Sequence, residues 1–298
     1  MRLVFCATLM VSLLATVYAS DEKVAGIIEQ VQCRAELMER LGHNSIRLDP
    51  KRDIGRSLFP GDSVVCTSSG WIQLLVFGRV VKINHPGIPY PIPYVRPQHL
   101  SDEEQMRQSA LEDYSRRGGR ERSGEEPEGA SVTLKFFYIL LPVIQGGPLS
   151  VSIQNKIGKE IWHGNVTSST GLLESAEASD AIGQYQQSGG GQLTVLISQN
   201  DKQQQISYYV LSREAEKQLE AALAVWDGEQ SGLMRHIGRA SVFSDALLFE
   251  AAGREYEAAL ADAPESGDLR QAAVEEYRRA GDDNRANNLG IGSAPLAR

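Results

Sequence analysis

The period of the hydrophobic pattern changes once along this chain of 298 residues. Up to about residue 212, short apolar segments of strand length are separated by turns rich in Gly, Pro, Asn and Asp, which is typical of antiparallel β structure. From about residue 213 onward, Ala and Leu recur at helical spacing. The sequence therefore predicts a multidomain chain with β modules first and an α region last. The expected divisions are 1–19, a signal peptide; 20–95, a small all-β module; 96–130, a helix and a disordered linker; 131–212, a β-sandwich; and 213–298, helices.

The first 19 residues have the pattern of a secretory signal peptide. Arg2 gives a short positive start, residues 3–17 are almost wholly apolar, and Val17-Tyr18-Ala19 fits the small-x-small rule for cleavage. A buried helix or a membrane anchor is the alternative, but an anchor needs about 20 apolar residues and this run is shorter. No later stretch is long and apolar enough to span a bilayer. We therefore expect a periplasmic or secreted protein with no transmembrane segment after cleavage.

The charge balance excludes two classes of partner. The formal net charge is -8 at pH 7, and the Lys and Arg residues form no basic stripe. Nucleic acids and anionic membranes are bound by clustered positive charge, so neither is expected as the main partner. A protein partner in the cell envelope is expected instead, and the sequence indicates no oligomeric state.

Two cysteines, Cys33 and Cys66, remain once the predicted signal peptide is removed. In an oxidising compartment such a pair is a candidate disulfide. On the chain-entropy model the closed loop would stabilise the fold by roughly 3–4 kcal/mol. Two buried free thiols are the alternative.

A strand–turn–strand pattern runs through residues 58–83. Pro60-Gly61 predicts a tight turn, because Pro fixes one backbone angle and Gly tolerates positive φ. Residues 63–67 then predict a short strand, and residues 71–83 predict a long strand or a hairpin around Gly78.

Residues 58–67 contain the motif Leu-x-Pro-Gly-Asp-x-Val-x-x-Thr. With the turn and the apolar strand that follow, it resembles the FecR-type periplasmic domain. The resemblance implies a small all-β fold and a place in the cell envelope. It implies less about signalling, which in that family needs a transmembrane helix and a cytoplasmic tail. The chain departs from the family at Phe77-Gly78, where members usually have Asp-Gly.

A proline-rich strip follows the first module. Five prolines lie between Pro86 and Pro97, with Tyr90 and Tyr94 among them. Proline breaks helices and removes ladder donors, so the strip should be extended. It could dock on a partner through its aromatic side chains, or it is a stiff spacer or an edge segment packed on its own module.

One helix and a linker are predicted between the two β modules. Ser101 and Glu104 have the spacing of a capping box, so a short amphipathic helix should begin there. Residues 118–129 are Gly, Arg and Glu with almost nothing apolar. Such a segment cannot bury enough surface to offset its ordering entropy, which predicts a disordered linker.

Strand signals return in the second module, at residues 131–212. The predicted strands are 132–141, 149–154, 159–166, 192–198 and 203–211. Short connections join the second to the third and the fourth to the fifth, which indicates two hairpins. Several short strands without an intervening helix suggest an immunoglobulin-like β-sandwich.

From residue 233 onward the chain resembles tetratricopeptide repeats, which are stacked pairs of antiparallel helices. The residues with the spacing of the repeat's second helix are Ala252, Tyr256, Ala259 and Pro264. The resemblance implies a surface for peptides or partner proteins, and Phe249, Tyr256 and Tyr277 mark the helices expected to bind one. A helical hairpin that only packs on its neighbouring module is the alternative.

The motifs of common enzymes are missing from the sequence. The five histidines are scattered without metal-ligand spacing, and there is no Gly-x-Ser-x-Gly elbow. We therefore predict no catalytic, cofactor-binding or metal site. The expected function is a non-enzymatic exported envelope protein that acts as a protein-binding scaffold or assembly factor. A periplasmic ligand-sensing or cell-wall-binding module is the alternative, and an enzyme of unrecognised type is a third hypothesis.

Overall fold

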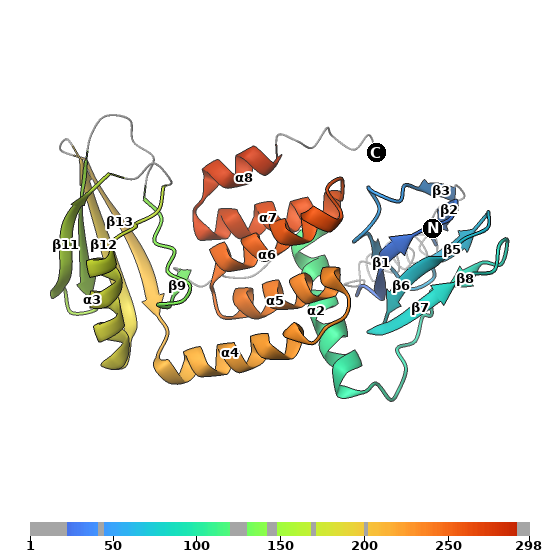
Figure 1. The fold of residues 1–298 in the computed structure, drawn as a ribbon, viewed down its shortest axis with the longest axis horizontal. Helices are drawn as coiled ribbons and strands as arrows, with labels where there is room; N and C mark the ends of the chain where they lie inside the picture. The colour runs from blue at the N-terminus through green and yellow to red at the C-terminus, as the bar shows by residue number, and fades with distance from the viewer. Residues whose placement is uncertain are drawn as a thin grey trace, which may run out of the picture. The chain divides into compact units, whose positions relative to one another are not determined.

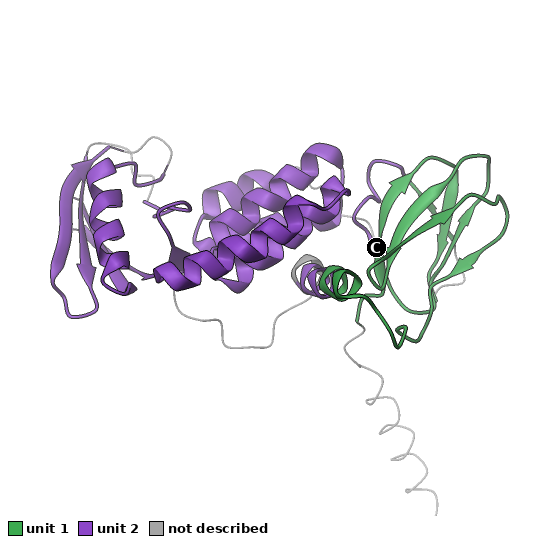
Figure 2. Ribbon diagram, turned by 60° about the horizontal axis from the view of Figure 1, so that its bottom comes forward, with its two compact units in different colours: residues 1–48, 57–108 green, residues 49–56, 109–298 purple. Residues whose placement is uncertain are grey.

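The computed structural model describes residues 23–40, 45–119, 130–141, 148–167, 171–199 and 202–290. These residues form two compact units, coloured separately in Figure 2. Unit 1 comprises the described residues up to 48 and from 57 to 108, and unit 2 comprises residues 49–56 and the described residues from 109 onward. The predicted signal peptide, His43 and most of the predicted linker at 118–129 lie outside the described residues. The predicted order, β structure first and a helical region last, is confirmed.

Unit 1 contains two four-stranded antiparallel sheets. Its strands are β1 (Gly26–Val31), β2 (Ala35–Met38), β3 (Ser45–Leu48), β4 (Ser57–Leu58), β5 (Ser63–Cys66), β6 (Ile72–Val76), β7 (Arg79–Ile83) and β8 (Tyr90–Pro91). One sheet has the order β4-β1-β6-β7 and the other β3-β2-β5-β8, and all of these strands except β4 are labelled in Figure 1. A single buried core joins them, because Ile28 and Leu74 of the first sheet belong to the same cluster as Leu37 and Val64 of the second.

The β6–β7 hairpin turns at Phe77 and Gly78. Both residues have positive φ, 48° and 77°, a conformation that two-residue hairpins favour and that suits Gly, Asn or Asp best. Phe77 is held there because its side chain packs in the core of unit 1, where the residue is 7 % exposed. Gly78 is required for a second reason, since an added Cβ would overlap the carbonyl oxygen of Glu104.

The capping box predicted at Ser101 is confirmed at the start of helix α2 (Asp102–Gly119). The Glu104 amide donates to the Ser101 hydroxyl oxygen at 3.2 Å, and the Ser101 amide donates to the Glu104 carboxylate at 2.8 Å. Arg79 of β7 donates to the same carboxylate at 2.9 Å. The bonds from Ser101 and Arg79 lower the pKa of Glu104, so the carboxylate stays ionised and ties the helix start to the sheet edge.

The second β region is a single five-stranded sheet in unit 2. Its strands are β9 (Ala130–Val132), β10 (Leu149–Asn155), β11 (Glu160–Val166), β12 (Gly191–Gln199) and β13 (Lys202–Val210), in the order β11-β10-β12-β13-β9. The two predicted hairpins, β10–β11 and β12–β13, are confirmed. Helix α3 (Ala176–Gln187) covers one face, because its Ala178 and Ile182 share a buried cluster with Val151 and Val195 (Figure 1).

Two expectations for this region are wrong. The described residues form one sheet with a covering helix, where two facing sheets without a helix were expected. The missed signal was the four-residue spacing of Ala178 and Ile182 behind Ser175, whose hydroxyl accepts from the Ala178 amide at 3.2 Å and caps α3. The strand expected at 132–141 ends at Val132, because Thr133 accepts from the Phe136 amide at 3.1 Å and turns the chain.

The helical end consists of five helices within the described residues. They are α4 (Arg213–Asp227), α5 (Gly232–Asp245), α6 (Phe249–Asp262), α7 (Gly267–Ala280) and α8 (Asp283–Gly290). Each helix packs on the next along the chain, and the short connections make neighbours antiparallel (Figure 1). α4 packs tightly on α5 at Gly238, where an added Cβ would overlap the buried indole of Trp226.

The second half of α2 and the loop 49–56 also belong to unit 2. The Tyr114 hydroxyl donates to the Gly55 carbonyl at 3.0 Å, and the Ser241 hydroxyl donates to the Asp113 carboxylate at 2.9 Å. The rings of Tyr114 and Tyr256 lie 5.9 Å apart. Buried polar and aromatic contacts therefore hold α2 against α5 and α6.

Acid is expected to weaken unit 2 through Glu255. Burial opposes ionisation of this carboxyl group, but hydrogen bonds with His236 at 2.7 Å and from Arg239 at 2.8 Å outweigh it, so the pKa of Glu255 is lowered. A group with a lowered folded-state pKa stabilises fully above its unfolded-state pKa, and this contribution is lost as the pH falls through the folded-state value. Glu255→Gln should flatten that part of a melting-temperature profile, measured from neutral to acid pH, whereas the exposed control Glu265→Gln should not. Equal profiles for both variants would contradict the expectation.

Candidate functional site

Cys33 and Cys66, the candidate pair, form a disulfide in unit 1, with Cα atoms 5.9 Å apart. Cys66 is fully buried at the end of β5, and Cys33 lies partly buried between β1 and β2. The alternative of two free thiols is therefore wrong. The bond ties together parts of the module that are separated by 33 positions in the sequence.

Phe249, Tyr256 and Tyr277, expected to mark partner-binding helices, are all buried inside the helix stack. The Arg279 guanidinium lies 3.8 Å from the centre of the Phe249 ring. Tyr277 packs against Gly253, where an added Cβ would be 2.8 Å from the ring. These aromatic side chains fill the gaps between helices, so a partner would have to contact other side chains of the stack.

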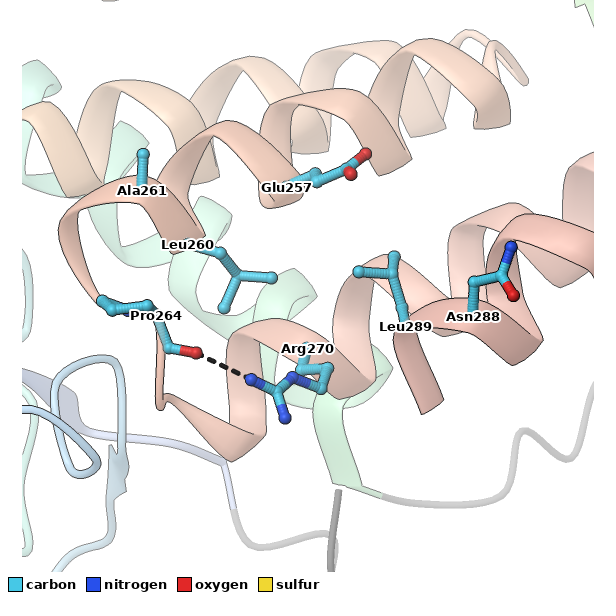
Figure 3. A pocket seen from close by; sticks show the side chains of 7 residues that line it. All are labelled: Glu257, Leu260, Ala261, Pro264, Arg270, Asn288 and Leu289. Atoms are coloured by element: carbon cyan, nitrogen blue, oxygen red, sulfur yellow. Dashed lines mark hydrogen bonds between the residues drawn. The ribbon is translucent and has the colours of Figure 1, made fainter. Parts of the chain in front are cut away.

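A shallow, open pocket of about 390 Å³ lies on the surface of α6, α7 and α8. It is lined by Glu257, Leu260, Ala261, Pro264, Arg270, Asn288 and Leu289. Figure 3 shows the Leu260 and Leu289 side chains pointing into the space between α6 and α8. The charged and amide side chains stand around these two. None of the lining residues was among the expected site residues.

The local fold of this region follows from two helix ends. α6 ends at Asp262, two residues before Pro264, which cannot continue a helix. α7 ends at Ala280, and the next residue, Gly281, has a φ of 82°, the left-handed conformation that commonly follows a helix C-terminus. These two turns reverse the chain twice and bring α8 beside α6. Pro264 was noted in the sequence, but the residues that α8 contributes could be found only from the packing.

A chain of ionic contacts fixes the Glu257 side of the pocket. The Tyr277 hydroxyl donates to the Glu257 carboxylate at 2.6 Å, and Arg285 of α8 donates to it at 2.8 Å. Arg285 also donates to Glu250 at 3.2 Å. Burial, and then the bond to Glu257, raise the pKa of Tyr277, so its hydroxyl remains protonated as the donor. The carboxylate is thus held in one orientation at the pocket wall.

The opposite side of the pocket combines a restrained cation with an exposed amide. Arg270 donates to the Pro264 carbonyl at 2.7 Å, as Figure 3 shows. Asn288 is exposed and offers both donors and an acceptor, which can pair with the N–H and C=O groups of an extended backbone. An apolar floor with a few polar groups at its rim suits a peptide side chain and its neighbouring backbone.

The proline-rich strip partly packs on its own module. Tyr90–Pro91 is edge strand β8, which pairs with β5, and Ile92 is 1 % exposed. This matches the edge-segment alternative for that part of the strip. Beyond it, Tyr94 is 72 % exposed and Val95 is 77 % exposed.

In the part of the chain that the structure describes, no group of three or more His, Cys, Asp or Glu side chains could hold a metal ion. Among the same residues, no helix combines the length and apolar character needed to cross a membrane.

Comparison with known proteins assigns this chain to no family. A scan against protein-family models finds no match, and a search of the curated proteins finds no significantly similar sequence.

Proposed function

We propose that this chain is a non-enzymatic scaffold or assembly protein of the cell envelope, and that it holds an extended segment of a partner protein in the pocket on α6, α7 and α8. The observation that carries the proposal is the pocket itself: two leucines at the base and oriented polar groups around them. A partner side chain would be buried against Leu260 and Leu289, and the amide of Asn288 would pair with its backbone.

Two further features support the proposal. The antiparallel stack of α5 to α8, with buried aromatic residues at Tyr256 and Tyr277, agrees with the resemblance to tetratricopeptide repeats, whose surfaces hold peptides. The Cys33–Cys66 disulfide suits an oxidising compartment. It agrees with the N-terminal signal pattern and with the FecR-type resemblance of the first module.

The test compares pocket variants with neighbouring variants outside the pocket. Ala261→Trp would fill the pocket and Asn288→Arg would replace the amide at its rim. Ala258→Trp and Asn287→Arg make the same changes at exposed positions that do not line it. The full-length proteins would be immobilised and exposed to envelope extract, and bound proteins would be quantified by mass spectrometry. We expect at least one bound protein to fall about tenfold, or 1.4 kcal/mol, with both pocket variants and to be retained by both controls.

An unchanged set of bound proteins would also be informative. If the bound proteins are the same for pocket variants and controls, partner binding does not use this pocket and the proposal is wrong. Circular dichroism on all four variants checks that the helices remain folded.

The second candidate is a ligand-sensing or cell-wall-binding module. It is favoured by one observation in unit 1, the high exposure of Tyr94 and Val95 beside the β8 edge. An exposed aromatic ring can stack on a sugar. Co-sedimentation with purified peptidoglycan distinguishes the two functions. If the second function holds, the wild-type protein should sediment with peptidoglycan and Tyr94→Ala should stay in solution.

A further inference from the structure

The sheet edges of this protein differ in how well they are protected. An open edge strand can pair with another chain. In native proteins, edge strands are usually protected because they are short, contain Lys or Pro, or are covered by another segment. Edge strands β4, β8 and β9 have only two or three residues, and β3 and β7 carry Arg or Lys. β9 is also covered, since the Ser131 amide donates to the Leu247 carbonyl of the α5–α6 connection at 2.8 Å.

β11, the opposite edge of the same sheet, has none of these features among the described residues. It is seven residues long, and its sequence, Glu-Ile-Trp-His-Gly-Asn-Val, contains no Lys, Arg or Pro. It pairs with β10 on one side, and no described strand pairs with it on the other. A register shift near Glu160 leaves residues 162–166 as the regular part of this edge.

The hydrophobic core is also incomplete along β11. Ile161, Trp162 and Val166 contact the buried cluster beneath α3, but each is only partly buried. The Trp162 ring lies across Gly164, where an added Cβ would be 2.5 Å from Cζ2. A strand added beside β11 would cover the exposed parts of these side chains and pair the outward backbone groups.

We propose that β11 pairs antiparallel with the β11 of a second copy of this chain, about a two-fold axis at Gly164. Gly164 then faces itself, where the absence of a Cβ lets the two backbones approach. On the α3 side each Trp162 lies opposite Val166 of the second copy, an aromatic and β-branched pair. On the other side each His163 lies opposite Asn165 of the second copy. The two sheets become one continuous sheet.

The sequence of β11 favours a second copy as the occupant. In this register no like charges lie directly opposite each other at neutral pH, and the large and apolar residues fall on one side of both strands. The pairing is isologous, so one strand supplies both halves of the interface. Because the contact is small, the expected Kd is on the order of micromolar.

Sedimentation of the full chain over a range of concentrations tests the pairing. The weight-average mass should rise from one chain toward two as concentration increases. In the double variant His163→Lys and Asn165→Lys, lysines would lie opposite lysines, so the mass should stay that of one chain. The matched control is Gln203→Lys and Gln205→Lys, which places two exposed lysines on β13 in the same cross-strand rows of the same face. The control should associate as the wild type does.

Cysteine cross-linking tests the register. His163→Cys and Asn165→Cys proteins would be oxidised with glutathione disulfide, separately and as a mixture. Only the mixture should form a cross-linked dimer at high yield, because only opposed positions bring Cα atoms within bonding reach. A wild type that stays a single chain at all concentrations, equal loss of association in both lysine variants, or cross-linking of either cysteine variant alone would each overturn the proposal.

Discussion

Arg279→Met is expected to lower the free energy of unfolding of unit 2 by about 3–5 kcal/mol, the cost of removing one partner from a buried ion pair. Arg279 of α7 donates to the Glu276 carboxylate at 3.1 Å and to the Ser244 hydroxyl of α5 at 2.8 Å. The side chains of Arg279 and Glu276 are 7 % and 0 % exposed. Methionine keeps much of the packing on Phe249 but removes the cation that lies against the buried Glu276 carboxylate. Urea unfolding followed by the helical circular dichroism signal measures the loss.

Two further variants isolate the cause of that loss. Arg278→Met changes the exposed neighbouring residue and should shift the stability by no more than about 0.5 kcal/mol. Adding Glu276→Gln to Arg279→Met should recover part of the loss, because no charge is then left buried. If the double variant is less stable than Arg279→Met alone, the buried charge is not the cause.

Removal of the disulfide is expected to lower the stability of unit 1 by about 3–4 kcal/mol, the loop-closure entropy that the bond removes from the unfolded chain. The bonded residues are 33 positions apart, and Cys66 is fully buried in the core cluster. In the variant Cys33→Ala and Cys66→Ala, the midpoint of urea unfolding of unit 1, followed by hydrogen exchange and mass spectrometry of peptides from its strands, should fall. Unit 2 should keep its own transition, because its core clusters contain neither cysteine.

Reduction provides the control for this second expectation. Wild-type protein treated with dithiothreitol should unfold near the midpoint of the alanine variant, whose own midpoint should not respond to the reductant. If the wild type unfolded at the same urea concentration with and without reductant, the disulfide would not contribute to the stability of unit 1.

Local signals in the sequence predicted much of the fold. The capping box at Ser101 and Glu104 contains its own hydrogen-bond partners, so the start of α2 could be located before any packing was known. For residues 71–83 a hairpin around Gly78 was one of two alternatives, and the positive φ of Gly78 shows that the chain turns there. Pro264 likewise predicted the end of α6.

Prediction from the sequence was less successful where the same residue pattern fits two different structural roles. Tyr256 and Tyr277 have the same spacing whether they fill a helix interface or face a partner. Only the packing of Tyr114 on Tyr256, and of Gly253 on Tyr277, shows that both are buried. The apolar residues at 136–140 suited a strand in composition. The side-chain bond at Thr133 turns the chain there instead.

The sequence by itself determined the order of β and α structure, the helix and turn boundaries marked by capping residues, Gly and Pro, and the pair of cysteines able to bond. These depend on interactions within a few residues or on a single candidate pair. The tertiary structure decided that the second β region is one sheet with a helix, that the pocket gathers Leu260 and Leu289 from different helices, and that β11 is an edge of this sheet among the described residues. Each of these depends on which distant segments meet, and no local pattern encodes that choice.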